Sequence, residues 1–224
     1  MQTQGTTGWM GGQLGAARLR ATIALAAILI GACAHDRPRP PTDVPPALQV
    51  PAGQKLTRML HATGVQIYQC KASAKDPSRY TWVYQEPKAE LSDSSGKDIG
   101  THYAGPTWEA DDGSKVVADV VARADAPGAV TPGASTPGAS TPGASTPGAS
   151  TPGAAALTPI GIQWLLLRSK SNTGKKGVFA KTQSIQRLHT IGGLAPQDSC
   201  DAARADQRTR VAYSADYYFY NGRR

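Results

Sequence analysis

Short apolar and β-branched runs alternate with turn-forming residues along most of the chain. Residues 65–70 (VQIYQC) alternate in polarity, and residues 80–84 (YTWVY) are rich in aromatic and β-branched side chains. Further runs of the same character are residues 115–121, 162–167, 182–188 and 211–220. Each run is short and is bounded by Gly, Pro, Asp, Asn or Ser, which is typical of β-strands. The pattern therefore predicts a mostly β protein.

Two turn sequences predict antiparallel connections between such strands. Residues 111–114 (DDGS) and 171–174 (SNTG) have the composition of hairpin turns. No segment keeps a 3.6-residue apolar period over three turns, and the best helical candidate, residues 199–207, is short. We expect a single-domain antiparallel β-sandwich or barrel with few short helices, and the pattern is compatible with either architecture.

A low-complexity repeat interrupts these strands. Residues 131–155 repeat Thr-Pro-Gly-Ala-Ser and end on Thr-Pro-Gly-Ala-Ala, without a charged or aromatic residue. Such a composition cannot form a core, and closing a long loop costs little free energy. We expect residues 127–157 to be a flexible loop within one β-rich domain, residues 52–224. An O-glycosylated or wall-spanning segment is the functional alternative.

The N-terminal region has the pattern of a lipoprotein signal peptide. Two arginines precede the apolar run of residues 21–30, which leads into Gly31-Ala32-Cys33. This run is too short to span a bilayer as a helix, which needs about 20 residues. Residues 1–32 are therefore expected to be a lipoprotein signal peptide that starts at Met1 or Met10, with Cys33 carrying the lipid (palmitate). The alternatives are an ordinary secretory signal and an uncleaved anchor.

The residues after Cys33 bear on the location of the protein. Ala34 in place of Asp predicts an outer-membrane lipoprotein of the bacterial cell envelope, facing the periplasm or the surface. Residues 33–51 are expected to form a Pro-rich extended tether, because residues 35–51 contain six prolines. The expected partners are the membrane, through the lipid anchor, and a cell-surface glycan, a lipid or an envelope protein.

The remaining cysteines predict a disulfide. If Cys33 is lipidated, Cys70 and Cys200 are left as an even pair in an oxidising compartment. The alternative is two separate buried thiols. The chain has no CxxC sequence, so neither a redox motif nor a zinc ribbon is indicated.

The positive charge is concentrated in the C-terminal part. Residues 33–130 contain 11 Lys and Arg and 12 Asp and Glu, whereas residues 156–224 contain 11 Lys and Arg and 4 Asp. In the envelope such a surface fits anionic lipid headgroups or lipopolysaccharide, and an ordinary solvated face is the alternative. Nucleic acid is not an expected partner, because the basic residues are scattered through strand-like segments without a recognition motif.

The densest group of chemically active side chains lies in residues 101–109 (THYAGPTWE). The Gly-Pro turn can fold His102 towards Glu109, which would give a base with an orienting carboxylate or two ligands of a metal. The alternative is a structural hairpin with Trp108 in the core. His102 and Glu109 are therefore the catalytic candidates, and Tyr103 and Trp108 are binding candidates.

Other chemical signals are weak. His61 and His189 are the other histidines of the predicted domain, but no HExxH or HxH spacing joins any two of the three, so no metal site is predicted. No cofactor is expected, since the sequence has no GxSxG, dinucleotide or phosphate-loop motif. Tyr218 and Tyr220 share one face of a strand and would form a sugar-stacking strip if that face were exposed.

Several segments together resemble a bacterial and fungal family of secreted proteins of uncharacterised function, the DUF3455 type. The resemblance covers roughly residues 50–220 apart from the repeat, and it is carried by residues 61–70, 101–109, 164–168, 184–187, 192–196, 200–201 and 215–220. It implies one domain with Cys70 and Cys200 as family positions and no established activity. Some fungal relatives carry a malate dehydrogenase label, which this sequence does not support, because it lacks the dinucleotide fingerprint and the alternating strand–helix pattern.

These observations favour a non-enzymatic envelope lipoprotein that displays a binding or structural β-domain. The alternative is a hydrolase or metal-dependent enzyme centred on His102 and Glu109, which requires the two side chains to meet in one pocket.

Overall fold

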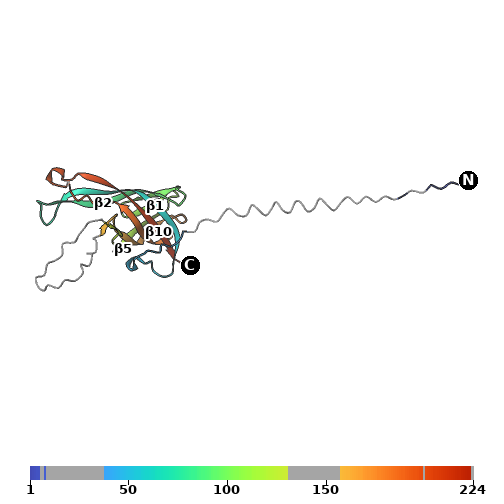
Figure 1. The fold of residues 1–224 in the computed structure, drawn as a ribbon, viewed down its shortest axis with the longest axis horizontal. Helices are drawn as coiled ribbons and strands as arrows, with labels where there is room; N and C mark the ends of the chain where they lie inside the picture. The colour runs from blue at the N-terminus through green and yellow to red at the C-terminus, as the bar shows by residue number, and fades with distance from the viewer. Residues whose placement is uncertain (6–7, 9–37, 131–156, 199, 223–224) are drawn as a thin grey trace, which may run out of the picture. The chain divides into compact units, whose positions relative to one another are not determined.

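The computed structural model describes residues 1–5, 8, 38–130, 157–198 and 200–222. The apolar run of the predicted signal peptide, the lipidation site Cys33 and the repeat lie outside these residues, so those expectations stay predictions. By its internal contacts the chain divides into Met1–Asp36 and Arg37–Arg224, and every strand described here belongs to the second unit (Figure 1).

In the described part of the chain, eight antiparallel strands close into a barrel in the order β1-β10-β9-β8-β5-β4-β3-β2. Their bounds are β1 (Gln54–Ala72), β2 (Tyr80–Ser92), β3 (Asp98–Tyr103), β4 (Thr107–Ala110), β5 (Lys115–Ala124), β8 (Trp164–Thr173), β9 (Thr182–Gly192) and β10 (Arg208–Gly222). The remaining elements are β6 (Gly128–Val130), which pairs with β7 (Leu157–Pro159), and the short 3-10 helices η1 (Pro46–Leu48) and η2 (Ala202–Arg204). The prediction of a mostly β antiparallel domain is confirmed, and of the two architectures the chain adopts the barrel.

All six predicted strands are present, but the connections differ in part. Residues 111–114 form the expected turn between β4 and β5. The turn expected at 171–174 lies further on, because β8 continues to Thr173 and residues 174–181 form the connection to β9. Within the described part of residues 199–207, only η2 is helical; the Asp201 side chain accepts a hydrogen bond from the Arg204 N–H there. None of the described helices is long and apolar enough to cross a membrane.

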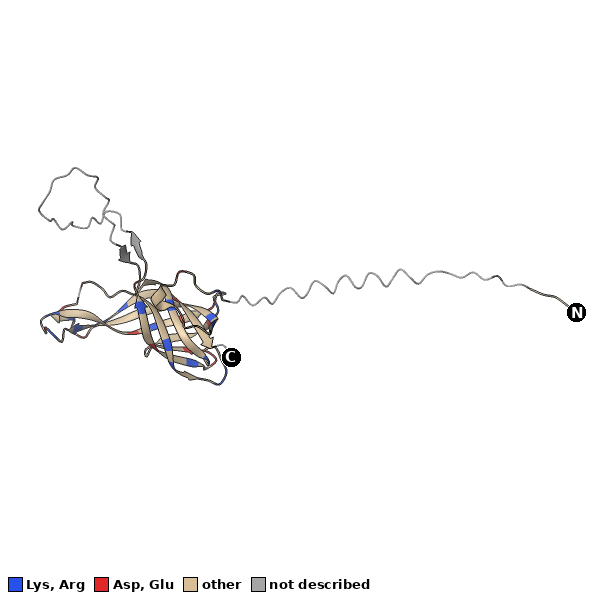
Figure 2. Ribbon diagram, turned by 90° about the horizontal axis from the view of Figure 1, so that it is seen from below, with Lys and Arg blue, Asp and Glu red and all other residues tan. Residues whose placement is uncertain are grey.

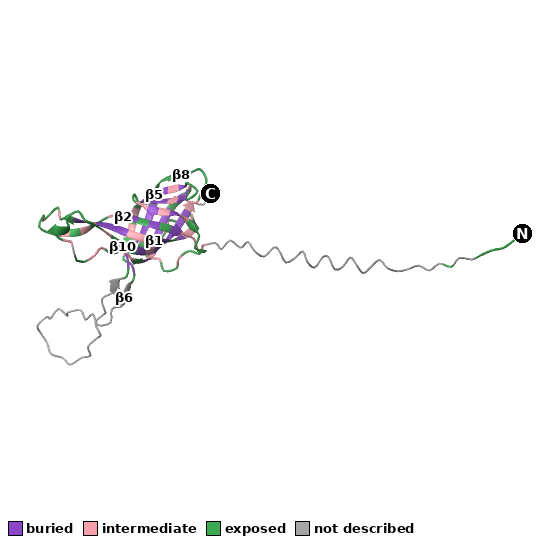
Figure 3. Ribbon diagram, turned by 90° about the horizontal axis from the view of Figure 1, so that it is seen from above, coloured by how far each residue is buried: buried purple, intermediate pink, exposed green. Residues whose placement is uncertain are grey.

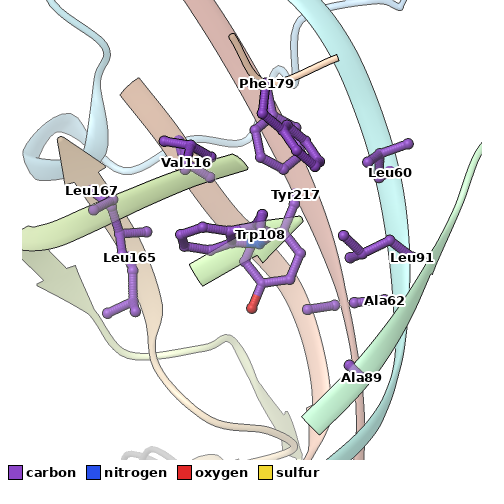
Figure 4. Packing of buried hydrophobic residues seen from close by; sticks show 14 of the residues in the cluster. Leu60, Ala62, Ala89, Leu91, Trp108, Val116, Leu165, Leu167, Phe179 and Tyr217 are labelled. Carbon is purple, nitrogen blue, oxygen red and sulfur yellow. The ribbon is translucent and has the colours of Figure 1, made fainter. Parts of the chain in front are cut away.

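The inner face of the barrel forms the main core. On β10, Tyr213, Ala215, Tyr217 and Phe219 point inward, as the alternation of a strand requires. Buried and exposed stretches accordingly alternate over the barrel in Figure 3. Figure 4 shows Trp108 between the Tyr217 ring and the aliphatic side chains of β8. Lys and Arg are spread over several strands in Figure 2 and do not form one cluster.

One end of the barrel is plugged by the connection between β8 and β9. Phe179 in this connection is fully buried, and its ring lies 4.8 Å from the Phe219 ring between centroids. Its backbone N–H donates to Ser114 Oγ at 3.0 Å, and the Val178 N–H donates to the Asp112 carboxylate at 2.9 Å. The plug is thus held by buried apolar area and by hydrogen bonds to the β4–β5 turn.

Residues 43–50, which we call the N-terminal strap, pack on the outside of the barrel. Leu48 in η1 is fully buried in a second apolar cluster, and its carbonyl accepts a hydrogen bond from Gln186 Nε2 at 2.7 Å. The cluster also contains Trp164, Tyr218 and Tyr220. This corrects the expectation of an extended tether up to residue 51: the apolar residues of the strap cover an apolar outer face that would otherwise be exposed to water.

A three-stranded arm extends beyond the barrel, with β1 in its centre. Residues 80–87 of β2 and 208–212 of β10 pair with β1 and, among the described strands, with no other. The tip of the arm is exposed in Figure 3. The disulfide Cys70–Cys200 joins the arm to the segment between β9 and β10, which confirms the predicted pairing.

Candidate functional site

A cavity of about 480 Å³ occupies the end of the barrel opposite the plug, which we call the mouth. Its inner wall is formed by His102, Trp108, Leu165, Leu167 and Tyr217. Its rim comes from the base of the arm, the β3–β4 turn and the start of β8. Residues from all eight barrel strands therefore converge on one space, and the rim also includes residues from the connections between strands.

A pair of glycines lets the chain turn across the mouth after β9. Gly192 and Gly193 have φ values of +70° and +75°, which favour glycine. A Cβ atom on Gly193 would lie 2.8 Å from Tyr213 Cβ and 3.0 Å from Gln66 Cγ. The Gly193 carbonyl accepts a hydrogen bond from the Tyr68 hydroxyl at 2.6 Å, so this segment is fixed at the rim, where Leu194 and Ala195 line the cavity.

Three of the inner-wall side chains are aromatic and contact one another. The His102 ring stacks on Trp108 with centroids 4.4 Å apart, and the Tyr217 ring meets both edge-on at 5.1 and 5.3 Å. His102 Nδ1 lies 2.8 Å from the Thr107 carbonyl oxygen, which only accepts, so Nδ1 carries the proton and Nε2 is the acceptor of the neutral ring. Burial lowers the pKa of His102 to about 3 and outweighs the hydrogen bond to Thr107. The ring is therefore neutral near pH 7.

Two buried polar atoms of this wall have no described partner. Gln66 Nε2 and Trp108 Nε1 make no hydrogen bond to any described residue, and the Tyr217 hydroxyl has the Tyr213 and Arg187 side chains beside it. Buried polar groups in native proteins are usually paired, and an unpaired one costs about 1–3 kcal/mol. Burial also raises the pKa of the Tyr217 hydroxyl, which therefore keeps its proton. The wall thus has hydrogen-bond donors that the described part of the protein does not use.

An arginine points into the mouth. Arg187 on β9 is paired in register with Leu165 on β8 and with Tyr217 on β10, both of which face inward. Its Nε and Nη2 donate to the Gln163 carbonyl at 3.1 and 2.7 Å. In the described structure, no carboxylate lies within ion-pair distance of this guanidinium.

The predicted pair of His102 and Glu109 does not form. The two strands are in register, with Thr101 opposite Glu109 and His102 opposite Trp108. Glu109 therefore shares the outer face with Thr101, while His102 points inward. On the outside the Glu109 carboxylate accepts from Tyr103 Oη at 2.5 Å and pairs with Lys115 Nζ at 3.0 Å. The Tyr103 and Lys115 hydrogen bonds lower the pKa of Glu109.

The four binding candidates are placed differently. Trp108 lines the cavity, whereas Tyr103 lies on the outer face with Glu109. Tyr218 and Tyr220 are buried in the cluster under the N-terminal strap, so they do not form an exposed sugar-stacking strip. The sequence alternation placed them on one face correctly, but it could not show that the strap covers this face.

The other two histidines lie on the outside of the barrel and share one carboxylate. His61 Nδ1 and His189 Nδ1 lie 3.0 and 2.9 Å from the two Asp216 oxygens, and His189 Nε2 lies 3.1 Å from Asp43 of the strap. Burial acts to lower the pKa of His189, but the hydrogen bonds to Asp216 and Asp43 outweigh it and raise this pKa. His102 is inside the barrel, so the three histidines do not converge. Among the described residues, no group of three or more His, Cys, Asp and Glu side chains is arranged to hold a metal ion.

The polar residues of the mouth, Arg187 and Gln66, are not among the site residues predicted from the sequence. Arg187 lies two residues after Ile185 and therefore on the same, buried face of its strand. A charge at an inward position of a predicted strand is unusual and would have been the signal. Gln66 carried a weaker signal, because the pattern of residues 65–70 did not show which face was buried.

Comparison with known proteins gives one match. A family model described as "Protein of unknown function (DUF3455)" matches residues 51–221. No curated protein and no solved structure matches the chain.

Proposed function

The chain belongs to the DUF3455 family, and because this membership implies no activity, we propose from the site itself that the barrel binds a small molecule in its mouth. The protein would act as a non-enzymatic binding module attached to the bacterial envelope through lipid on Cys33.

The observation that carries this proposal is the cavity. Its volume of about 480 Å³ is in the range of small-molecule sites, which are roughly 300–1,000 Å³ and combine apolar walls with a few polar groups. Eight-stranded barrels are just wide enough to hold one small ligand when side chains do not fill the interior. Here the plug fills one end of the interior and the mouth is hollow.

The path of the chain supports display on an anchor. Pro40 and Pro41 border the same surface hollow as Gln54 and Tyr220, where β1 begins at the plugged end. The strap returns to this point before it enters β1. A tether from Cys33 would therefore join the domain at the end opposite the mouth, which leaves the mouth open to its surroundings.

A fluorescent apolar dye tests the proposal. N-phenyl-1-naphthylamine should bind the full chain at one site, with a rise in fluorescence. Val120 lines the cavity and pairs with Leu167, so Val120→Trp should fill the space and abolish binding. Val121 is 50% exposed, so Val121→Trp adds the same side chain outside and should leave binding unchanged.

A second variant covers the case in which Val120→Trp does not fold. Ala104 is an exposed residue of the β3–β4 turn at the rim, and Ala104→Trp should obstruct the opening without disturbing the core. Dye binding that is absent in the wild type, or that survives both Val120→Trp and Ala104→Trp in folded protein, would refute the proposed function.

A further inference from the structure

We infer that the ligand is an organic acid, with its anionic oxygen group at Arg187 and its apolar body against Trp108, Leu165 and Tyr217. This inference rests on the proposed function, since it names the class of molecule that the mouth would bind.

The Arg187 guanidinium has hydrogen-bond donors left over for a ligand. A guanidinium has five N–H donors, and two hydrogen bonds to the Gln163 carbonyl leave others free. Arg187 is half-buried and, among the described residues, has no carboxylate partner. Buried charges are normally paired, and arginine is particularly suited to bind carboxylates and other oxyanions with two parallel hydrogen bonds.

The rim of the cavity carries positive charge, which favours an anionic ligand. Arg123 on β5 pairs with Leu165 from the other side, so Arg123 and Arg187 flank one inward leucine. Both arginines line the cavity, and none of its described lining residues is Asp or Glu. A cationic ligand would meet repulsion without compensation there, whereas an anion is attracted by both arginines.

The deeper part of the cavity is suited to an apolar body. Leu165, Leu167 and Trp108 give it apolar walls, which fit a hydrocarbon or aromatic body. Gln66 Nε2 and Trp108 Nε1 have no described partner, but both atoms are fully buried, so the apolar walls are what a ligand would contact here. Fatty acids and aromatic carboxylic acids share this chemistry.

Two dyes of matched shape separate the anionic group from the apolar body. 1-Anilinonaphthalene-8-sulfonate carries a sulfonate on the ring system of N-phenyl-1-naphthylamine. For the full chain, Arg187→Gln should weaken sulfonate-dye binding by about 10–100-fold, as expected for loss of a hydrogen bond to a charged group. Binding of the neutral dye should change by less than about twofold. Arg187→Lys, which keeps the charge without the planar fork, should lie between wild type and Arg187→Gln.

Arg168→Gln is the matched control. Arg168 lies on β8, the strand next to that of Arg187. It is exposed, and its side chain points to the outer face of the barrel. Arg168→Gln removes one positive charge, as Arg187→Gln does, so an effect of net charge alone would weaken sulfonate-dye binding in both variants. Competition by decanoate and by 2-naphthoate, with decanol and 2-methoxynaphthalene as neutral counterparts, then distinguishes a fatty acid from an aromatic acid.

The outcomes separate the two proposals. Binding of the neutral dye that Val120→Trp blocks would show that the mouth is a binding site. If Arg187→Gln then weakens the binding of both dyes equally, or of neither, the inference of an acid ligand is wrong. The inference is also wrong if Arg168→Gln reproduces the effect of Arg187→Gln. If neither dye binds the wild type, the proposed function fails first.

Discussion

The two ends of the barrel interior share the same strands, but one end is filled by a segment of the chain and the other holds a cavity. At the plugged end, the buried Phe179 N–H and the Val178 N–H each have a partner on the β4–β5 turn, and Asn172 donates to the Phe179 carbonyl at 2.8 Å. Buried polar atoms without a described partner occur at both ends, Gln66 Nε2 and Trp108 Nε1 at the mouth and Thr182 Oγ1 and Asn221 Oδ1 at the plugged end. The mouth also has an inward arginine with no described carboxylate.

This difference separates stability from binding within one fold. The buried Phe179 ring and the hydrogen bonds of the Val178 and Phe179 N–H groups stabilise the plugged end. The mouth lacks such a filling, and its inward Arg187 has no described carboxylate; this costs stability, as is expected where a protein keeps a charged group for a ligand. Substitutions of similar size at the two ends should therefore have different effects.

The largest contrast is expected from removing an aromatic ring at each end. Phe179→Ala should lower the free energy of unfolding by about 3–5 kcal/mol, because it leaves a cavity in the plug. Tyr84 lines the mouth and is 47% exposed, so Tyr84→Ala should cost less than about 1 kcal/mol but weaken dye binding. Denaturant titration and dye fluorescence measure the two effects. Equal losses of stability would show that the ends do not differ.

Acidification should have a smaller effect on stability, which arises from His102 at the mouth. His102 at the mouth has a folded pKa of about 3, and its unfolded pKa is about 6.5, so between these values the unfolded chain binds the extra proton. Stability therefore falls as the pH decreases through this window, by about 2–3 kcal/mol from pH 6.5 to 4.5.

The difference between wild type and His102→Asn isolates this contribution. Asn can still donate to the Thr107 carbonyl but does not titrate. The other titrating groups, including His189 with its raised pKa, are present in both proteins and cancel in the difference. Parallel stability curves of the two proteins from pH 6.5 to 4.5 would contradict burial of a neutral His102.

The smallest contrast concerns single hydroxyl groups. Ser114→Ala at the plugged end removes the partner of the buried Phe179 N–H and should cost about 1–2 kcal/mol. Tyr217→Phe at the mouth removes a buried hydroxyl that has only the Tyr213 and Arg187 side chains beside it and should change stability by less than about 1 kcal/mol. Chemical denaturation resolves both changes. A loss in Tyr217→Phe as large as that in Ser114→Ala would mean that the Tyr217 hydroxyl is paired in the native protein.

Local pattern was enough to predict most of the strands and the disulfide. The strands have a two-residue period that survives in a single sequence, and the disulfide followed from counting cysteines under one assumption about Cys33. The short strands β3 and β4 were treated only as a possible hairpin, because four to six residues around a Gly-Pro turn give little alternation. Closure into a barrel depends on β1 pairing with β10, at opposite ends of the domain, and no local pattern records this pairing.

The site was harder to predict because it depends on which face of each strand is buried. His102 and Trp108 were identified, but their proposed partner Glu109 is one position out of phase and therefore lies outside the barrel. Arg187 was missed, because its inward direction follows from its register with Leu165 and Tyr217. A charged residue in a predicted strand is assumed to face solvent, and only its neighbours in the folded barrel show that Arg187 faces inward.

The N-terminal strap also has a mechanical consequence. A pulling force applied to the chain before residue 38 would load the contacts of Asp43 with His189 and of Leu48 with Gln186 before it reached the start of β1. Residues 43–50 could then peel away one contact at a time while the barrel stays closed. The released segment would lengthen the connection by up to about 27 Å, at roughly 3.4 Å per extended residue. The strap would thus lengthen under load before any strand of the barrel had to separate from its neighbours.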